Sequence, residues 1–270
     1  MYASSRVIAR IAACACVILV PQMAFAQSDS AETTDPRAAQ PERPTVATHA
    51  HTVAPGYLEV ETGVQYINVS DHRELDVPTL LKIGVTSHVQ ADLVQGYVNA
   101  RTSGVSTTGL TDFGVAVKWR LLDNAPVLGD FAIQPGVTWP TASRRTTGTG
   151  TTALSLLAIS SYDVGPVALD LNAGITKRTG DGSRAPKYAT VWTVSTGWNF
   201  PGSARYGWVA EVFGYPGTSG AAGSVPSVGF LTGPTLAVTK SLVLDAGAIF
   251  NARGFDGNSG YLGLTWNLGR

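Results

Sequence analysis

Apolar and polar positions alternate in stretches of about ten residues from Gly56 to the end of the chain. The first stretch, GYLEVETGVQYIN, sets Glu59, Glu61 and Gln65 against an apolar side, and FGVAVKWRL, VALDLNAGIT and LVLDAGAIF repeat the pattern. A period of two predicts β-strands with one apolar face, and no segment shows a helical period. We therefore expect an all-β domain of about twelve strands.

The connections between these stretches are alternately short and long. Short ones fall near residues 86–88, 164–166, 201–204 and 239–241, with a somewhat longer one near 122–129. Longer loops rich in Gly, Ser and Thr fall near 99–108, 141–151, 177–187, 216–226 and 252–259, and a modest one at 69–74. Short turns at one rim and long loops at the other are typical of outer-membrane barrels. The pattern favours a closed antiparallel up-and-down transmembrane β-barrel over residues 56–270.

A secreted β-sandwich would show the same alternation, so other features must separate the two folds. Charges lie in the middle of the polar faces, where a sandwich that buried them would have to pair them and a water-filled barrel would not. The last strand, YLGLTWNLGR, would be an aggregation-prone edge in water. Its closure against residues 56–68 removes that edge, and a closed barrel leaves no backbone unpaired in lipid.

The six tryptophans lie near strand ends on the apolar faces. Four are expected at the short-turn rim and two toward the long-loop rim: Trp119, Trp198, Trp208 and Trp266, then Trp139 and Trp192. Two aromatic girdles at the lipid headgroup levels would have this placement. The tryptophans therefore favour the membrane barrel over the sandwich.

Three prolines fall inside predicted strands, at Pro78, Pro135 and Pro234. Each removes a donor from the ladder, and a closed barrel offers no free edge to accommodate it. We therefore expect bulges or local register breaks at these positions.

The N-terminal residues 1–26 have the pattern of a cleaved secretory signal peptide. Arg6 and Arg10 precede the apolar run IAACACVILV, and Ala24-Phe25-Ala26 forms a small-x-small cleavage site. The alternative, an uncleaved anchor, is disfavoured because the run is short for a membrane span. Both cysteines lie in this segment, so the exported chain is expected to have no thiol chemistry.

Residues 27–55 are polar and rich in Pro, Ala and Thr, which predicts a flexible periplasmic lead-in. His49 and His51 lie in it, but no carboxylate or cysteine completes a metal-ligand set, so we expect no metal site. The whole chain has 19 basic and 19 acidic residues, and loss of Arg6 and Arg10 leaves it slightly acidic. No run of basic residues suggests a nucleic-acid partner.

Inward-facing polar residues form the candidate selectivity site of the barrel. They are Glu59, Glu61, Gln65, Lys82, Asp92, Asp112, Lys118, Arg120, Asp170, Asn172, Glu211 and Asp245. Charges that line a lumen set the selectivity of permeation, and the acidic surplus predicts a mild preference for cations or tolerance of neutral solutes. The alternative is that these groups form ion pairs across a narrow lumen and plug it.

Enzymatic chemistry has little support in the sequence. There is no Gly-x-Ser-x-Gly elbow, phosphate loop or His-Glu-x-x-His, and no cofactor motif. Ser70, His72 and Glu74 sit together in the first outer loop and leave a lipid hydrolase as a remote alternative. We expect a non-enzymatic barrel whose basic outer loops contact lipopolysaccharide or solute, or are simply solvated.

Several segments resemble the outer-membrane family named for the MetA pathway of phenol degradation. The similar segments are PERPTVATHAHTVAPGYLEVETGVQY, LLKIGVTSHVQADL, GLTDFGVAVKWRLLD, VAEVFGY and SLVLDAGAIF. The last strand is also similar to the signal read by the barrel-assembly machinery, at Tyr261, Gly263, Trp266 and Leu268. The resemblance implies an outer-membrane barrel of a Gram-negative bacterium that transports small compounds, with aromatic or hydrophobic ones among the candidates.

Together these patterns predict a channel for passive, selective uptake of small molecules across the outer membrane. Outer-membrane lipid, lipopolysaccharide, the barrel-assembly machinery and a small solute are the expected partners. The alternative function is a structural or surface-interaction barrel with a plugged lumen and adhesive loops. Liposome swelling separates the two, because only a channel lets small solutes through.

Overall fold

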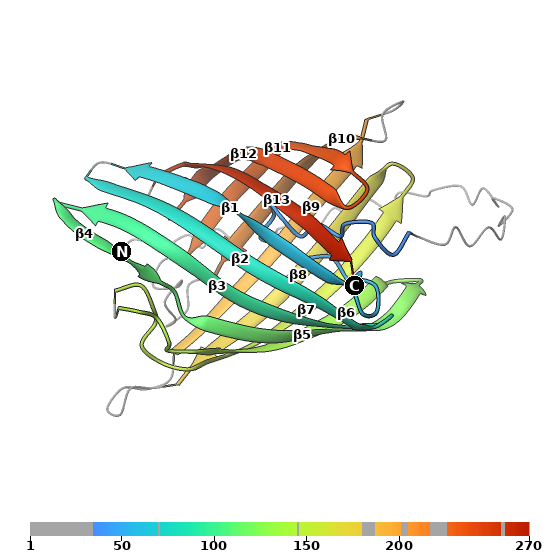
Figure 1. Cartoon of the computed structure of the whole chain (residues 1–270), viewed down its shortest axis with the longest axis horizontal. Helices are drawn as coiled ribbons and strands as arrows, with labels where there is room; N and C mark the ends of the chain where they lie inside the picture. The colour runs from blue at the N-terminus through green and yellow to red at the C-terminus, as the bar shows by residue number, and fades with distance from the viewer. Residues whose placement is uncertain are drawn as a thin grey trace, which may run out of the picture. The chain divides into compact units, whose positions relative to one another are not determined.

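The computed structural model describes residues 35–69, 71–144, 146–179, 187–200, 205–216, 226–254 and 257–269. In these ranges the chain forms thirteen β-strands (Figure 1). They are β1 (Leu58–Val69), β2 (His72–Thr86), β3 (Val89–Thr102), β4 (Val105–Leu110), β5 (Phe113–Ala125), β6 (Gly129–Trp139), β7 (Ala153–Val164), β8 (Val167–Arg178), β9 (Lys187–Asn199), β10 (Tyr206–Tyr215), β11 (Ser227–Thr239), β12 (Leu242–Arg253) and β13 (Ser259–Gly269). No helix within the described ranges is long and apolar enough to cross a membrane. The predicted signal peptide, residues 1–26, lies outside them.

The strands close into one antiparallel barrel. β1 pairs with both β2 and β13, and β2 pairs with β3, so the ring has no free edge. β4 and β5 both pair with β3, at its residues 97–102 and 89–94. Together they therefore occupy a single strand position in the barrel. The thirteen strands therefore fill twelve strand positions around the barrel, and the predicted fold class is confirmed.

Two of the predicted outer loops are strand instead. The expected loop at 99–108 is a β-hairpin that extends β3 and β4, and much of the expected loop at 69–74 is strand, because β1 ends at Val69 and β2 begins at His72. The hairpin turns at Ser103 and Gly104, which both have positive φ (48° and 84°), as a tight primed turn requires. Val105, Thr107 and the neighbouring threonines suit strands, so the composition that predicted a loop was misleading here.

At the three strand prolines the ladder is interrupted but the register is kept. On one side of each proline two successive residue pairs are missing, for example between Thr62↔Thr79 and Gln65↔Asp76 in the β1–β2 ladder. The same gap flanks Pro135 in β5–β6 and Pro234 in β11–β12, and the register on its two sides is unchanged. The expected breaks therefore consist of missing hydrogen bonds, and no bulge forms at these positions.

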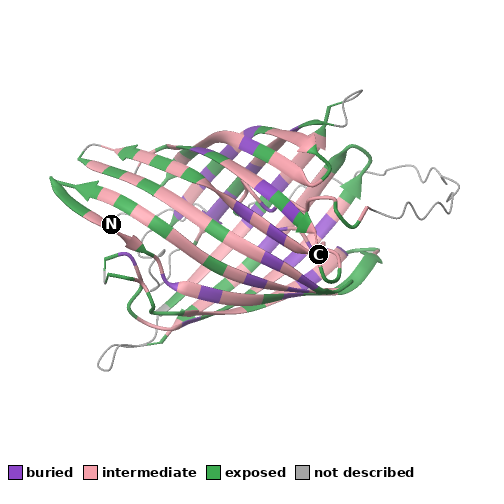
Figure 2. Cartoon of the chain, in the orientation of Figure 1, coloured by how far each residue is buried: buried purple, intermediate pink, exposed green. Residues whose placement is uncertain are grey.

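The two faces of the wall differ in the way that the alternation predicted. Outward positions carry apolar side chains, such as Leu262 (60% exposed) and Trp266 (50% exposed). All six tryptophans have outward parity, and the indole N–H of Trp208 donates to Thr232 Oγ1 at 2.7 Å. Buried residues gather in the half of the barrel nearer the C-terminus (Figure 2). Most of the polar candidates lie in this half.

Candidate functional site

Residues 35–55, here called the inner segment, run along the inner wall of the barrel. We expected a flexible lead-in, but Ala47, Ala50 and Val53 are 3%, 0% and 0% exposed. Ala50 packs against Ala132 of β6 and Ile159 of β7. The composition predicted flexibility because it contains too few large apolar residues for a core of its own. In the barrel the wall supplies the missing contacts.

The wall supplies acceptors for the backbone N–H groups of the inner segment along its whole course. The pairs are Gln40–Glu59 (2.8 Å), Glu42–Glu61 (2.7 Å), Val46 and Ala47–Glu211 (both 3.1 Å), Thr48–Asn172 (2.8 Å), Ala50–Ser161 (2.8 Å) and Val53–Gln90 (2.8 Å). A segment without regular secondary structure must find such partners outside itself. The acidic surplus of the wall therefore serves first to hold the inner segment.

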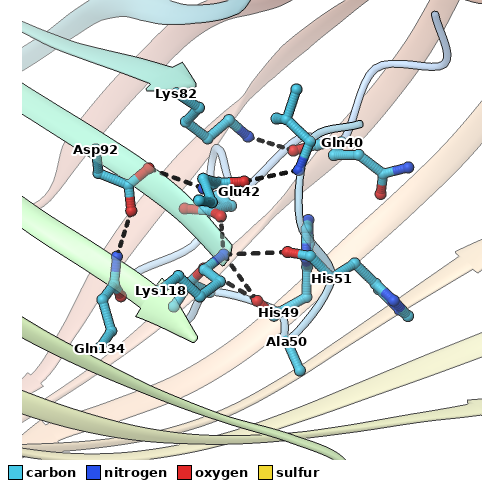
Figure 3. A network of polar contacts seen from close by, with 12 residues as sticks. Gln40, Glu42, His49, Ala50, His51, Lys82, Asp92, Lys118 and Gln134 are labelled. Atoms are coloured by element: carbon cyan, nitrogen blue, oxygen red, sulfur yellow. Dashed lines mark hydrogen bonds and ion pairs between the residues drawn. The ribbon is translucent and has the colours of Figure 1, made fainter. Parts of the chain in front are cut away.

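Lys118 of β5 is the main cationic contact between the wall and the inner segment (Figure 3). Its ammonium, which is fully buried, contacts the carboxylate of Glu42 and donates to Thr48 Oγ1 (2.9 Å). It also donates to the backbone oxygens of His49 (2.9 Å) and His51 (3.4 Å). Burial alone would raise the pKa of Glu42, but the charges of Lys118 and Lys82 outweigh it and hold that pKa far below its usual value.

Two further cations tie the inner segment to β1, β2, β12 and β13. Lys82 Nζ lies 2.6 Å from both Glu59 Oε1 and Glu61 Oε1, and it also donates to the backbone oxygen of Gln40. Arg43 pairs with Asp245 at 3.9 Å.

Arg43 lies over two wall glycines that face each other across β1 and β13. A Cβ at Gly63 would come within 2.7 Å of Arg43 Nη2, and one at Gly263 within 2.6 Å of Arg43 Nε. Glycine at both positions therefore gives the guanidinium its place against the wall.

The other predicted lumen residues have separate roles. Asp92 accepts from Gln90 (2.8 Å) and Gln134 (2.6 Å), and Asp170 accepts from Ser161 Oγ (2.6 Å). Asp112 does not join the network of contacts that holds the inner segment. It accepts from the backbone N–H of Ala142 (3.0 Å) and Thr149 (2.6 Å), and so fixes the loop after β6. Arg120 is also outside the network, because its guanidinium contacts Asp123 (2.9 Å) and the Ser87 oxygen (3.0 Å) at the short-turn rim. Gln65 donates to Ser259 Oγ at 3.0 Å.

Two cavities lie on opposite sides of the inner segment. One of about 420 Å³ is also lined by residues of the short turns, such as Gly165 and Asn199. The other, of about 240 Å³, is lined farther along the lumen by Pro78 and Val94. The residues that line both cavities all belong to the inner segment: Glu42, Arg43, Thr45 and Ala47. The inner segment therefore forms the partition between them.

No family model and no curated protein matches the chain. The resemblance to the MetA-pathway family is thus not confirmed and stays a prediction.

Solved structures do match the barrel. An outer-membrane channel from Pseudomonas putida F1 has a TM-score of 0.63 and 13% identity, covering 81% of this chain and 98% of that one. The NanC porin has a TM-score of 0.53 and 13% identity, covering 78% and 100%. The KdgM porin has a TM-score of 0.50 and 10% identity, covering 77% and 98%. At these identities the likeness establishes a shared barrel fold.

The remaining sequence candidates are placed as follows. His72 Nε2 lies 3.3 Å from Glu74 and Nδ1 lies 2.7 Å from Thr102 Oγ1, so both ring nitrogens are engaged; Ser70 lies outside the described residues. Among the described residues no group of His, Cys, Asp and Glu side chains could hold a metal ion. In β13, Tyr261 and Gly263 face inward while Trp266 and Leu268 face outward, and their role in assembly stays a prediction.

Sequence reasoning missed the functional residues of the inner segment itself. Glu42, Arg43 and His49 lie where composition suggested solvated linker. One available signal was the inward-facing polar set, since several neighbouring strands place an acid or amide near the short-turn end. Buried acceptors on several neighbouring strands need hydrogen-bond donors, and another part of the chain inside the barrel can supply them.

Proposed function

We propose that the chain is an outer-membrane channel for passive uptake of small solutes, and that the inner segment controls its permeation. The closed barrel and the polar lumen support a channel. The observation that carries the proposal is the partition of the lumen into two cavities by residues 42–47. A solute that crosses the barrel would have to pass this partition. Displacement of the inner segment would therefore set the rate of permeation.

The proposed solutes are cations and neutral molecules of small size. The wall contributes Glu59, Glu61, Asp92, Asp170 and Glu211 near the partition, against Lys82 and Lys118. Anions would meet this acidic surface once the backbone donors of the inner segment move away. An aromatic cargo is supported only by the family resemblance.

Deletion of residues 35–54 is expected to open the lumen. The wall acceptors then bind water, and the two cavities become one passage. In liposome swelling, the truncated barrel should admit a small neutral sugar severalfold faster than the full mature chain. An unchanged rate, with the barrel shown to be folded, would contradict the role of the inner segment as the barrier.

Planar-bilayer recording under a salt gradient is expected to show a reversal potential whose sign indicates that cations permeate more readily than anions. The reason is the carboxylate surplus of the lumen wall, and Glu211→Gln should reduce the selectivity. Asp123→Asn at the short-turn rim is the matched control, because Asp123 pairs with Arg120 outside the network. Clear anion selectivity would overturn the proposed solute class.

A structural or surface-interaction barrel is the second candidate function. It is favoured by the same contacts, because the inner segment engages Lys118 and the wall carboxylates Glu59, Glu61 and Glu211. This candidate predicts no swelling with any solute for the full mature chain, even where the chain lacking residues 35–54 swells. Swelling of the full mature chain therefore decides between the two.

A further inference from the structure

His49 is an unusual member of the inner segment. Both of its ring nitrogens are shielded from solvent and have no hydrogen-bond partner among the described residues. His49 is one of the residues that line the 420 Å³ cavity on the short-turn side of the partition, and its ring lies 5.3 Å, centroid to centroid, from the ring of His51. An imidazole without a partner in such a place is held in its neutral form.

The charged groups around His49 come from each element that faces it. Lys118 of β5 and Lys82 of β2 oppose a positive imidazole, as does a charged His51, while Glu42 favours one. Asp163 and Asp170 line the same cavity from β7 and β8. Burial, and next to it the ammonium of Lys118, hold the pKa of His49 well below the ordinary histidine value.

We propose that protonation of His49 releases the inner segment from the wall, so that the partition opens in mildly acidic surroundings. Lys118 is the contact that fails, because it donates to the backbone oxygen of His49 itself and would face a second positive charge there. The consequence for transport rests on the proposed function, whereas release itself does not.

The direction follows from linkage between protonation and docking. In the released segment His49 is in water and titrates near pH 6.5, whereas the docked segment holds it neutral. Docking is therefore fully favourable above that pH and weakens as the pH falls below it. Each further pH unit shifts the equilibrium about tenfold, which gives about 30-fold between pH 7.5 and pH 5.0.

His51 provides a matched control on the same segment. Its Nδ1 lies 3.6 Å from Asp130 and its Nε2 lies 3.7 Å from Asp163. Each ring nitrogen of His51 therefore faces a wall carboxylate. Neither ring nitrogen of His49 has such a partner in the part of the chain that the structure describes, so the acid response is expected to depend on His49 and not on His51.

Hydrogen exchange of the inner segment measures release directly, without any transport. The backbone N–H groups of residues 46–53 that bond to the wall exchange only when the segment leaves it. Protection of a peptide covering residues 44–54, corrected for the intrinsic pH dependence of exchange, is compared at pH 7.5 and 5.0. The mature wild-type chain, His49→Gln and His51→Gln are measured in the same detergent, with a β8 peptide as reference.

We expect protection of the wild-type inner segment to fall about 30-fold more than that of the β8 peptide. His49→Gln should lose most of this fall, whereas His51→Gln should retain it. A wild-type change below about threefold, or an equal change in His49→Gln, would overturn the proposal. Because swelling is not the readout, acid release of the inner segment in a barrel that passes no solute would refute the proposed channel and leave the proposed release intact.

Discussion

Deletion of residues 261–270 is expected to abolish assembly of the barrel. β13 pairs with β12 on one side and with β1 on the other, from Leu58↔Gly269 to Ile67↔Ser259. Without it, both neighbours present a row of unpaired N–H and C=O groups, which lipid cannot satisfy. We expect no folded band that changes mobility on heating, and no protein in the outer-membrane fraction.

A shorter deletion separates closure from the mere loss of the chain end. Gly269 is the last residue of β13, so removal of residues 269–270 leaves nearly all of both ladders in place. This variant should insert normally. If the chain lacking residues 261–270 also inserts as a folded barrel, both the closure and the assembly signal at Tyr261, Gly263, Trp266 and Leu268 are wrong.

The barrel could be predicted because each strand carries its own signal. Outward residues such as Leu262 and Trp266 must be apolar whatever their neighbours are, so the alternation is local and readable. The hairpin at Ser103–Gly104 was missed because turn chemistry and strand chemistry overlap in Ser, Thr and Gly. Composition alone does not tell a long hairpin from a loop.

The inner segment could not be predicted because its conformation is set from a distance. The acceptor for Val46 and Ala47 is Glu211, more than 160 positions along the chain, and the acceptor for Thr48 is Asn172. Residues 35–55 have no period and few large apolar side chains, so they have no local signal. Parity placed Glu59 and Lys118 inside the barrel, but parity cannot show whether they face water or another part of the chain.

Lys118→Met is expected to release the inner segment at neutral pH. The substitution removes a buried ammonium that contacts the Glu42 carboxylate and three oxygens of Thr48, His49 and His51. Removal of one partner of a buried ion pair costs about 3–5 kcal/mol, because the other charge is left unpaired. Protection of the inner segment from hydrogen exchange should fall more than a hundredfold, and liposome swelling should accelerate.

The double variant Lys118→Met/Glu42→Gln tests whether the unpaired charge is the cause. Replacement of both partners leaves no isolated carboxylate, so part of the lost protection should return, although the oxygens of His49 and His51 still lack their donor. Heat modifiability must show a folded barrel in each variant. If the single variant keeps wild-type protection, the wall acceptors alone hold the inner segment and Lys118 is not required for docking. If the single and double variants lose protection equally, the backbone oxygens rather than the Glu42 pair carry the contribution of Lys118 to docking.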